Sequence, residues 1–154
     1  MKSLAPIQRL ADGLFNQKWQ RLHADGSLQT DKLSYPGVYL LAYTGKKLEG
    51  MGINPRDVLY VGMSNSAGGV RQRLDQFMTG IKKNTSHSGA MRFYREFSNS
   101  RPFSETGGRK RFYFAAKTVP CESRKAFSGS DDFRKMGHVA CLEYYIIEIG
   151  RAHV

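Results

Sequence analysis

Residues 36–62 read PGVYLLAYTGKKLEGMGINPRDVLYVG, and this stretch decides the fold. Its two apolar, aromatic-rich runs, 36–43 and 58–62, are bounded by Pro, Gly and Asn, which is typical of two antiparallel strands joined by a polar loop. Tyr39 and Tyr60 hold matching places in a Gly-x-Tyr and a Tyr-x-Gly triplet, where glycine permits close approach of backbone or ligand. Two interpretations of the rings are open: core packing with a hydroxyl at the rim, or a shared functional cleft.

The charge of the chain is strongly positive. Its 154 residues suit one compact domain and carry 24 Lys and Arg against 13 Asp and Glu, which gives a net charge of +11. A basic surface of this kind binds phosphate backbones by releasing counterions, without reading their sequence. We therefore expect a nucleic acid as partner.

Neither a membrane segment nor a cysteine scaffold is visible in the sequence. There is no apolar run of the ~18 residues that a membrane span needs, and no signal-peptide pattern, so we expect no membrane partner. Cys121 and Cys141 are widely spaced and match no metal or redox motif, which predicts free thiols in a reducing compartment and hence a cytoplasmic location. No pattern indicates an oligomeric state.

One helix is predicted before the strand pair in the sequence, and another after it. Residues 7–22 place apolar side chains at helical spacing, so we expect 1–35 to form a helical extension and a loop. A second helix is predicted over 70–80, with one apolar stripe along it. Arg71 and Arg73 fall on opposite flanks of that stripe, and periodicity does not choose between them. Solvated side chains that snorkel from the helix are the simpler interpretation of both.

Further basic side chains follow this helix. A short helix is predicted over 90–97, after a basic polar loop, and its outward face could follow a phosphate backbone. The candidate nucleic-acid contacts are Arg71, Lys82, Lys83, His87, Arg92 and Arg95.

A third strand is predicted over 109–119. This segment is a continuous run of aromatic residues and alanines, which indicates burial on both faces.

The last predicted helix, 130–147, begins at the capping cluster Ser130-Asp131-Asp132. Glu143 lies in the middle of its apolar stripe, which is formed by Met136, Val139, Ala140, Ile146 and Ile147. An unpaired carboxylate there would cost several kcal/mol to bury, so Glu143 should meet an arginine, bind a metal ion or open into a cavity. A structural ion pair with arginine is the alternative to a functional site.

These features resemble the GIY-YIG nuclease family over most of residues 36–147. Gly37-Val38-Tyr39 is similar to the first triplet of the family and Tyr60-Val61-Gly62 to the second, and Glu143 stands where the family has its metal-binding glutamate. The resemblance implies an α+β fold, with a small three-stranded antiparallel sheet flanked by helices.

The resemblance also implies an activity, namely a metal-dependent endonuclease that hydrolyses phosphodiester bonds in DNA. In the family an arginine followed by an apolar residue comes after the second triplet, and Arg73 fits that pattern better than Arg71. It would contact the scissile phosphate, while Glu143 would hold Mg²⁺, a cation that suits one carboxylate plus waters and phosphate oxygens. Tyr39 or Tyr60 would orient or deprotonate the attacking water, a role that requires a lowered pKa.

The chain also departs from the family pattern. Phe77 stands where many members carry a histidine, and it cannot transfer a proton. His87 could substitute for that histidine from the following loop, and Lys82 or Lys83 could approach the phosphate. The insertion between the triplets is longer than in the excision-repair branch, so that nuclease is not the expected identity. Two alternatives follow: a catalytically impaired, basic nucleic-acid-binding module on the same fold, or a structural protein in which Glu143 and an arginine simply pair.

Residues 148–154 are a separate case. Their last six match the translation of a common sequencing-adapter string, so we hypothesise that 148–154 is a non-native tail. An asparagine that family members often carry after the glutamate helix would then be missing. Resequencing from intact DNA tests this, and a native frame that ends in these residues would contradict it.

Overall fold

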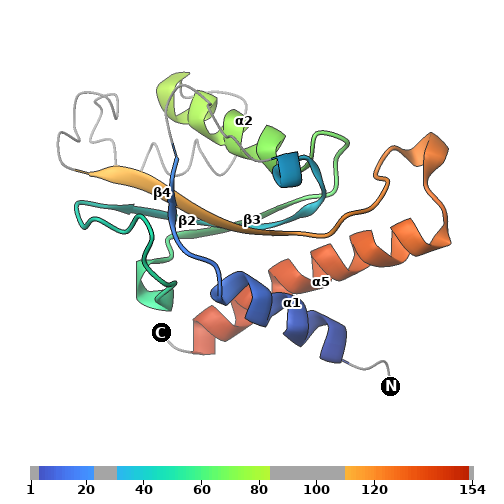
Figure 1. Ribbon diagram of the computed structural model, residues 1–154, viewed down its shortest axis with the longest axis horizontal. Coiled ribbons are helices and arrows are strands. Elements are labelled where there is room, and N and C mark those ends of the chain that lie inside the picture. Colours follow the sequence, from blue (N-terminus) through green and yellow to red (C-terminus); the bar gives the residue numbers. More distant parts are fainter. Residues whose placement is uncertain (1–3, 23–30, 84–109, 153–154) are drawn as a thin grey trace.

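The computed structural model describes residues 4–22, 31–83 and 110–152. Its centre is an antiparallel sheet of four strands in the order β1-β4-β2-β3 (Figure 1). The strands are β1 (Gln20–Arg21), β2 (Gly37–Thr44), β3 (Tyr60–Ser64) and β4 (Arg111–Thr118), and the α-helices are α1 (Ala5–Phe15), α2 (Gly69–Lys83) and α5 (Ser130–Ala152). Short 3₁₀ helices cover Asp31–Ser34, Pro55–Asp57 and Lys125–Phe127. The chain is thus an α+β protein, as the sequence predicts.

The two strands predicted within 36–62 are confirmed, and the first of them is central. β2 pairs with β3 on one side, from Gly37 opposite Ser64 to Leu41 opposite Tyr60, and with β4 on the other. The side chains of residues 38–42 are buried on both faces of the sheet. This double burial explains why β2 reads as a continuous apolar run rather than as an alternating one.

The sheet differs from the predicted three strands by the short strand β1. The helical spacing across 7–22 predicts one helix, but α1 ends at Phe15 and the chain turns toward the sheet. Trp19 is buried there and exchanges backbone hydrogen bonds of 2.9 Å with Gly50 and Met51. Burial of a tryptophan outweighs the continuation of an exposed helix, and β1 then pairs with β4.

The later elements follow the predicted order. The strand predicted over 109–119 is β4, and the helix predicted over 130–147 is α5, which continues to Ala152. The short helix predicted over 90–97 lies outside the described residues. Within the described segments, no helix is both long and apolar enough to cross a membrane.

Helices cover both faces of the sheet (Figure 1). α2 lies on one face, and α1 and α5 pack together on the other. Alternate residues of β2 point to opposite faces, so its tyrosines belong to the α2 side. The core under α2 includes Tyr39, Leu41, Val70, Leu74, Phe77, Phe112 and Phe114. The core under α1 and α5 includes Ile7, Leu14, Trp19, Val38, Leu40, Val139, Leu142 and Ile146.

Candidate functional site

The phenol ring of Tyr39 lies across Gly62 on the α2 face of the sheet. The two residues are paired in the β2–β3 register, and a Cβ at position 62 would collide with the ring and hydroxyl of Tyr39. Tyr39 is fully buried in the core under α2. The glycine of the second triplet therefore has a steric function, because it makes room for the tyrosine of the first.

Tyr60, at the start of β3, lies beside Tyr39. The centroids of the two rings are 6.1 Å apart, and Tyr60 is only partly buried. Phe77 of α2 is fully buried, and the centroid of its ring is 5.9 Å from that of Tyr60. Phe77, which cannot transfer a proton, therefore packs against Tyr60 as an apolar ring.

The backbone that carries Arg73 is fixed at the start of α2. Gly69 has a φ of 66°, in the left-handed region, and a Cβ there would collide with the backbone of Ser34. The N–H of Val70 donates to the carbonyl of Tyr35 at 3.1 Å. These contacts anchor the first turn of α2 to the segment before β2, and Arg73 follows one turn later.

The two arginines of α2 interact with different acidic residues. Burial raises the pKa of the Glu143 carboxyl, and the charge of Arg73 opposes this rise. Burial also raises the pKa of Asp75, and there the opposing charge is that of Arg71. Arg73 is thus the arginine that acts on Glu143, while Arg71 lies near an acid of its own helix.

The hydroxyl of Tyr39 is poorly suited to lose its proton. Burial is the largest cause that raises its pKa above the usual value, and the neighbouring Tyr60 adds to the rise. The charge of Arg73 and its hydrogen bond act in the opposite direction without reversing the shift. A general base requires a lowered pKa, and burial shifts the pKa of Tyr39 the other way, which disfavours Tyr39 for that role. A neutral phenol can accept a hydrogen bond from the Arg73 guanidinium and still has a proton to donate.

Glu143 lies at the side of the buried stripe of α5 rather than in its middle. The stripe consists of Val139, Leu142 and Ile146, whereas Ala140, which the sequence predicts within it, is exposed. Glu143 is partly buried, and no salt bridge joins it to another described residue. A direct ion pair with arginine, the structural alternative, is therefore absent from the described part of the chain.

The candidate residues converge although they come from both faces of the sheet. Tyr39, Tyr60 and Arg73 lie on the α2 face, and Glu143 comes from α5 on the other (Figure 1). Both helices pack against β3, the edge strand, which explains how Arg73 and Glu143 interact. No family model, curated protein or solved structure matches this chain. The convergence is therefore the ground on which a function is inferred.

The described residues fit one kind of metal site and not another. Among them, no group of three or more His, Cys, Asp and Glu side chains could hold an ion, so a site built wholly from protein ligands is not formed there. Glu143 is a half-buried carboxylate without a salt bridge to a described residue. A single carboxylate of this kind suits Mg²⁺, whose other ligands are waters and phosphate oxygens.

Two polar residues of this region were not predicted from the sequence. Gln76 accepts a hydrogen bond from Nη1 of Arg73 at 2.9 Å. Because Gln76 lies three residues after Arg73 in a predicted helix, the sequence could have indicated this contact. Asn65 follows β3, and its Nδ2 donates to the carbonyl of Met136 on α5 at 3.1 Å. No sequence pattern marks Asn65, because this contact joins segments far apart in the chain.

The predicted nucleic-acid contacts are only partly within the described residues. Arg71 lies partly buried on α2, and Lys82 and Lys83 are its last two residues. The other three, His87, Arg92 and Arg95, lie outside the described residues.

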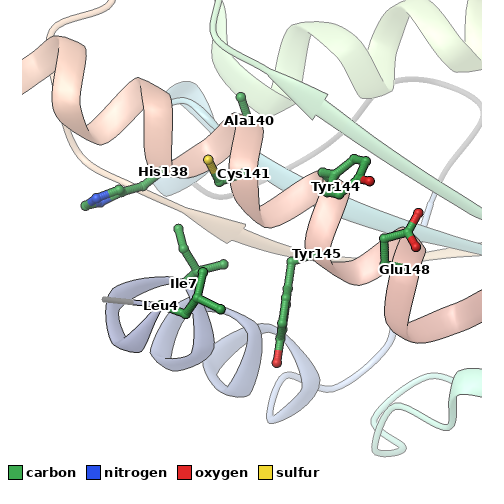
Figure 2. A pocket seen from close by; sticks show the side chains of 8 residues that line it. All are labelled: Leu4, Ile7, His138, Ala140, Cys141, Tyr144, Tyr145 and Glu148. Atoms are coloured by element: carbon green, nitrogen blue, oxygen red, sulfur yellow. The ribbon is translucent and has the colours of Figure 1, made fainter. Parts of the chain in front are cut away.

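A groove lies between α1 and α5, on the face of the sheet opposite α2 (Figures 1 and 2). Ile7 of α1 and Leu4, which directly precedes that helix, point toward α5 in Figure 2. The groove has a volume of about 580 Å³ and is lined by Leu4, Ile7, His138, Ala140, Cys141, Tyr144, Tyr145 and Glu148. None of the four converging residues lines it, so the groove is separate from the candidate site.

Proposed function

We propose that this chain is a metal-dependent endonuclease of the GIY-YIG type, which hydrolyses phosphodiester bonds in DNA. The observation that carries the proposal is the position of Arg73, whose guanidinium acts on both Tyr39 and Glu143. A buried phenol and a half-buried carboxylate are costly to gather in a core, and apolar residues would pack there at lower cost. Their convergence on one arginine therefore favours a functional role.

Arg73 is suited to bind the scissile phosphate. Its guanidinium is a planar fork of donors that matches phosphate oxygens and stays charged at any physiological pH. No salt bridge cancels that charge within the described segments. Because α2 is anchored at Gly69, the arginine reaches the site from a fixed backbone, which favours stabilisation of the charge that develops on the phosphate.

Glu143 is the residue that would hold Mg²⁺. When bound, the ion would lower the pKa of a water and offset negative charge on the phosphate. Burial raises the pKa of Glu143, so protons compete with the ion for this carboxylate. We therefore expect ion binding at neutral pH that weakens in acid.

The two tyrosines have different roles in this proposal. Tyr39 is buried and keeps its proton, and its oxygen accepts a hydrogen bond from Arg73, so its hydroxyl can orient a neighbouring group. Tyr60 is only partly buried and therefore has the better access to solvent. We assign to Tyr60 the contact with the attacking water.

A second candidate function is a nucleic-acid-binding module without catalytic activity. Phe77 favours it, because an apolar ring stands where a proton donor is common in the family. The raised pKa of Tyr39 favours it as well. The net charge of +11 would support binding to DNA under either proposal.

Incubation with supercoiled plasmid separates these functions. Nicking is measured with Mg²⁺ and with EDTA, and binding is measured in parallel at several salt concentrations. The endonuclease proposal predicts nicking in Mg²⁺ only, and its loss in Arg73→Ala but not in the charge-matched control Arg9→Ala, which lies on the exposed surface of α1. Salt-sensitive binding without nicking would support the binding module instead, and equal nicking in EDTA would contradict a metal-dependent reaction.

A further inference from the structure

Gln76 fixes the direction of the Arg73 side chain. Nη1 of Arg73 donates to Oε1 of Gln76 at 2.9 Å, and both side chains are partly buried. The two residues are three positions apart on α2, so they lie on the same side of the helix. A free arginine side chain has about 2 kcal/mol of rotamer entropy to lose on binding. A partner on one nitrogen removes part of that freedom before any ligand arrives.

The partner of Arg73 is neutral, and this has a chemical consequence. A carboxylate in the place of Gln76 would bind the guanidinium more strongly but would also cancel its charge. The amide orients the arginine and leaves the charge available for a phosphate. The acid of the same helix, Asp75, interacts with Arg71 instead. Within α2, Arg71 therefore has an acidic neighbour, whereas Arg73 has a neutral hydrogen-bond acceptor.

We infer that Gln76 is a positioning residue, which holds the guanidinium of Arg73 toward Tyr39 and the scissile phosphate while preserving its positive charge. This inference rests on the proposed function, and Gln76 acts through Arg73 rather than on the reacting atoms. If Gln76 positions Arg73 in this way, different substitutions at position 76 should change kcat and KM. Loss of the acceptor frees Arg73 and lowers kcat, whereas a carboxylate keeps the acceptor but weakens phosphate binding and raises KM.

The experiment compares the steady-state kinetics of plasmid nicking and the melting temperature for substitutions of the full chain. Gln76→Met keeps the length of the side chain without the acceptor, and we expect kcat to fall about tenfold, the lower end of the effect of a lost hydrogen bond to a charged group. Gln76→Glu should raise KM with a smaller change in kcat. The matched control is Gln72→Met, one turn earlier and exposed, which should behave as wild type. Gln76→Met combined with Arg73→Lys should be no slower than Arg73→Lys alone.

Several results would overturn the inference. They are wild-type kcat in Gln76→Met, effects of Gln76→Met and Arg73→Lys that simply add, and a fall in melting temperature that accounts for the whole loss of rate. Failure of the proposed function is a different result, in which wild type binds the plasmid without nicking it. The same variants are then compared by their Kd for duplex DNA. Non-additive effects of the substitutions at 73 and 76 on Kd support positioning of Arg73 for phosphate, and additive effects overturn it.

Discussion

Tyr39 and Gly62 face each other across β2 and β3, and the phenol ring of Tyr39 fills the space that a Cβ at position 62 would occupy. The close approach joins the two sequence triplets physically. It also makes the position of the Tyr39 hydroxyl, and through it the neighbourhood of Arg73, depend on the absence of a side chain at Gly62.

Gly62→Ala should therefore disturb the site and the core together. Overpacking of this kind costs about 1–3 kcal/mol of unfolding free energy, which urea denaturation measures. The matched control is Gly52→Ala, because a Cβ at Gly52 would have nothing within 4 Å. Equal stabilities of the two variants would show that the Tyr39 ring is free to move away from Gly62.

The two strands within 36–62 and their antiparallel pairing could be predicted from the sequence. Glycines beside Tyr39 and Tyr60 mark close approach, and turn residues bound each strand, so local chemistry alone indicates the hairpin. The later strand and helix follow from periodicity in the same way, whereas the α+β class was implied by the resemblance. Those signals are local, and the structure bears out the elements that they predict.

The unpredicted parts depend on contacts between distant segments. Trp19 leaves the helical pattern because it is buried with hydrogen bonds to Gly50 and Met51, and no local pattern reports that contact. Periodicity placed Glu143 within an apolar stripe, but only the packing of α5 decides that it lies at the side of the stripe. Gln76 was visible as a neighbour of Arg73, yet its role depends on which way the arginine turns.

The buried phenol of Tyr39 should resist ionisation. Its pKa is raised in the folded protein, so the charged form is disfavoured there, and stability should fall as pH rises above the usual tyrosine pKa of about 10. Near-ultraviolet absorbance of tyrosinate, compared between wild type and Tyr39→Phe, isolates this group. The difference in absorbance between the two proteins should not change with pH near the ordinary tyrosine pKa. The matched control is Tyr144→Phe, a substitution at an exposed position. A difference that titrates near or below the ordinary value would restore Tyr39 as a candidate base.

The stability of the protein should depend on the charge of Glu143. Burial raises the pKa of Glu143 in the folded state above its ordinary value, so the folded state binds the proton more tightly than the unfolded state. Stability is therefore lost as pH rises from that value through the raised folded pKa. Glu143→Gln should be more stable than wild type at neutral pH, and the two should converge in acid. A difference in melting temperature that stays constant with pH would contradict this.

Mg²⁺ should stabilise the protein through the same carboxylate. Binding to the folded state alone gives about 1.4 kcal/mol at ten times Kd, measured as a rise in melting temperature. The rise should disappear in Glu143→Gln and persist in the exposed control Glu49→Gln. Equal rises in both variants would place the ion elsewhere on the protein.

The measurement that tests the site most directly is the rate of Mg²⁺-dependent plasmid nicking by Glu143→Ala beside wild type and Glu49→Ala. If Glu143 holds the ion that the reaction needs, its removal should slow nicking by more than about a hundredfold, while Glu49→Ala cuts as wild type does. Melting temperatures confirm that both variants are folded. Undiminished nicking by folded Glu143→Ala would contradict the assignment of Glu143 and Arg73 to one catalytic site.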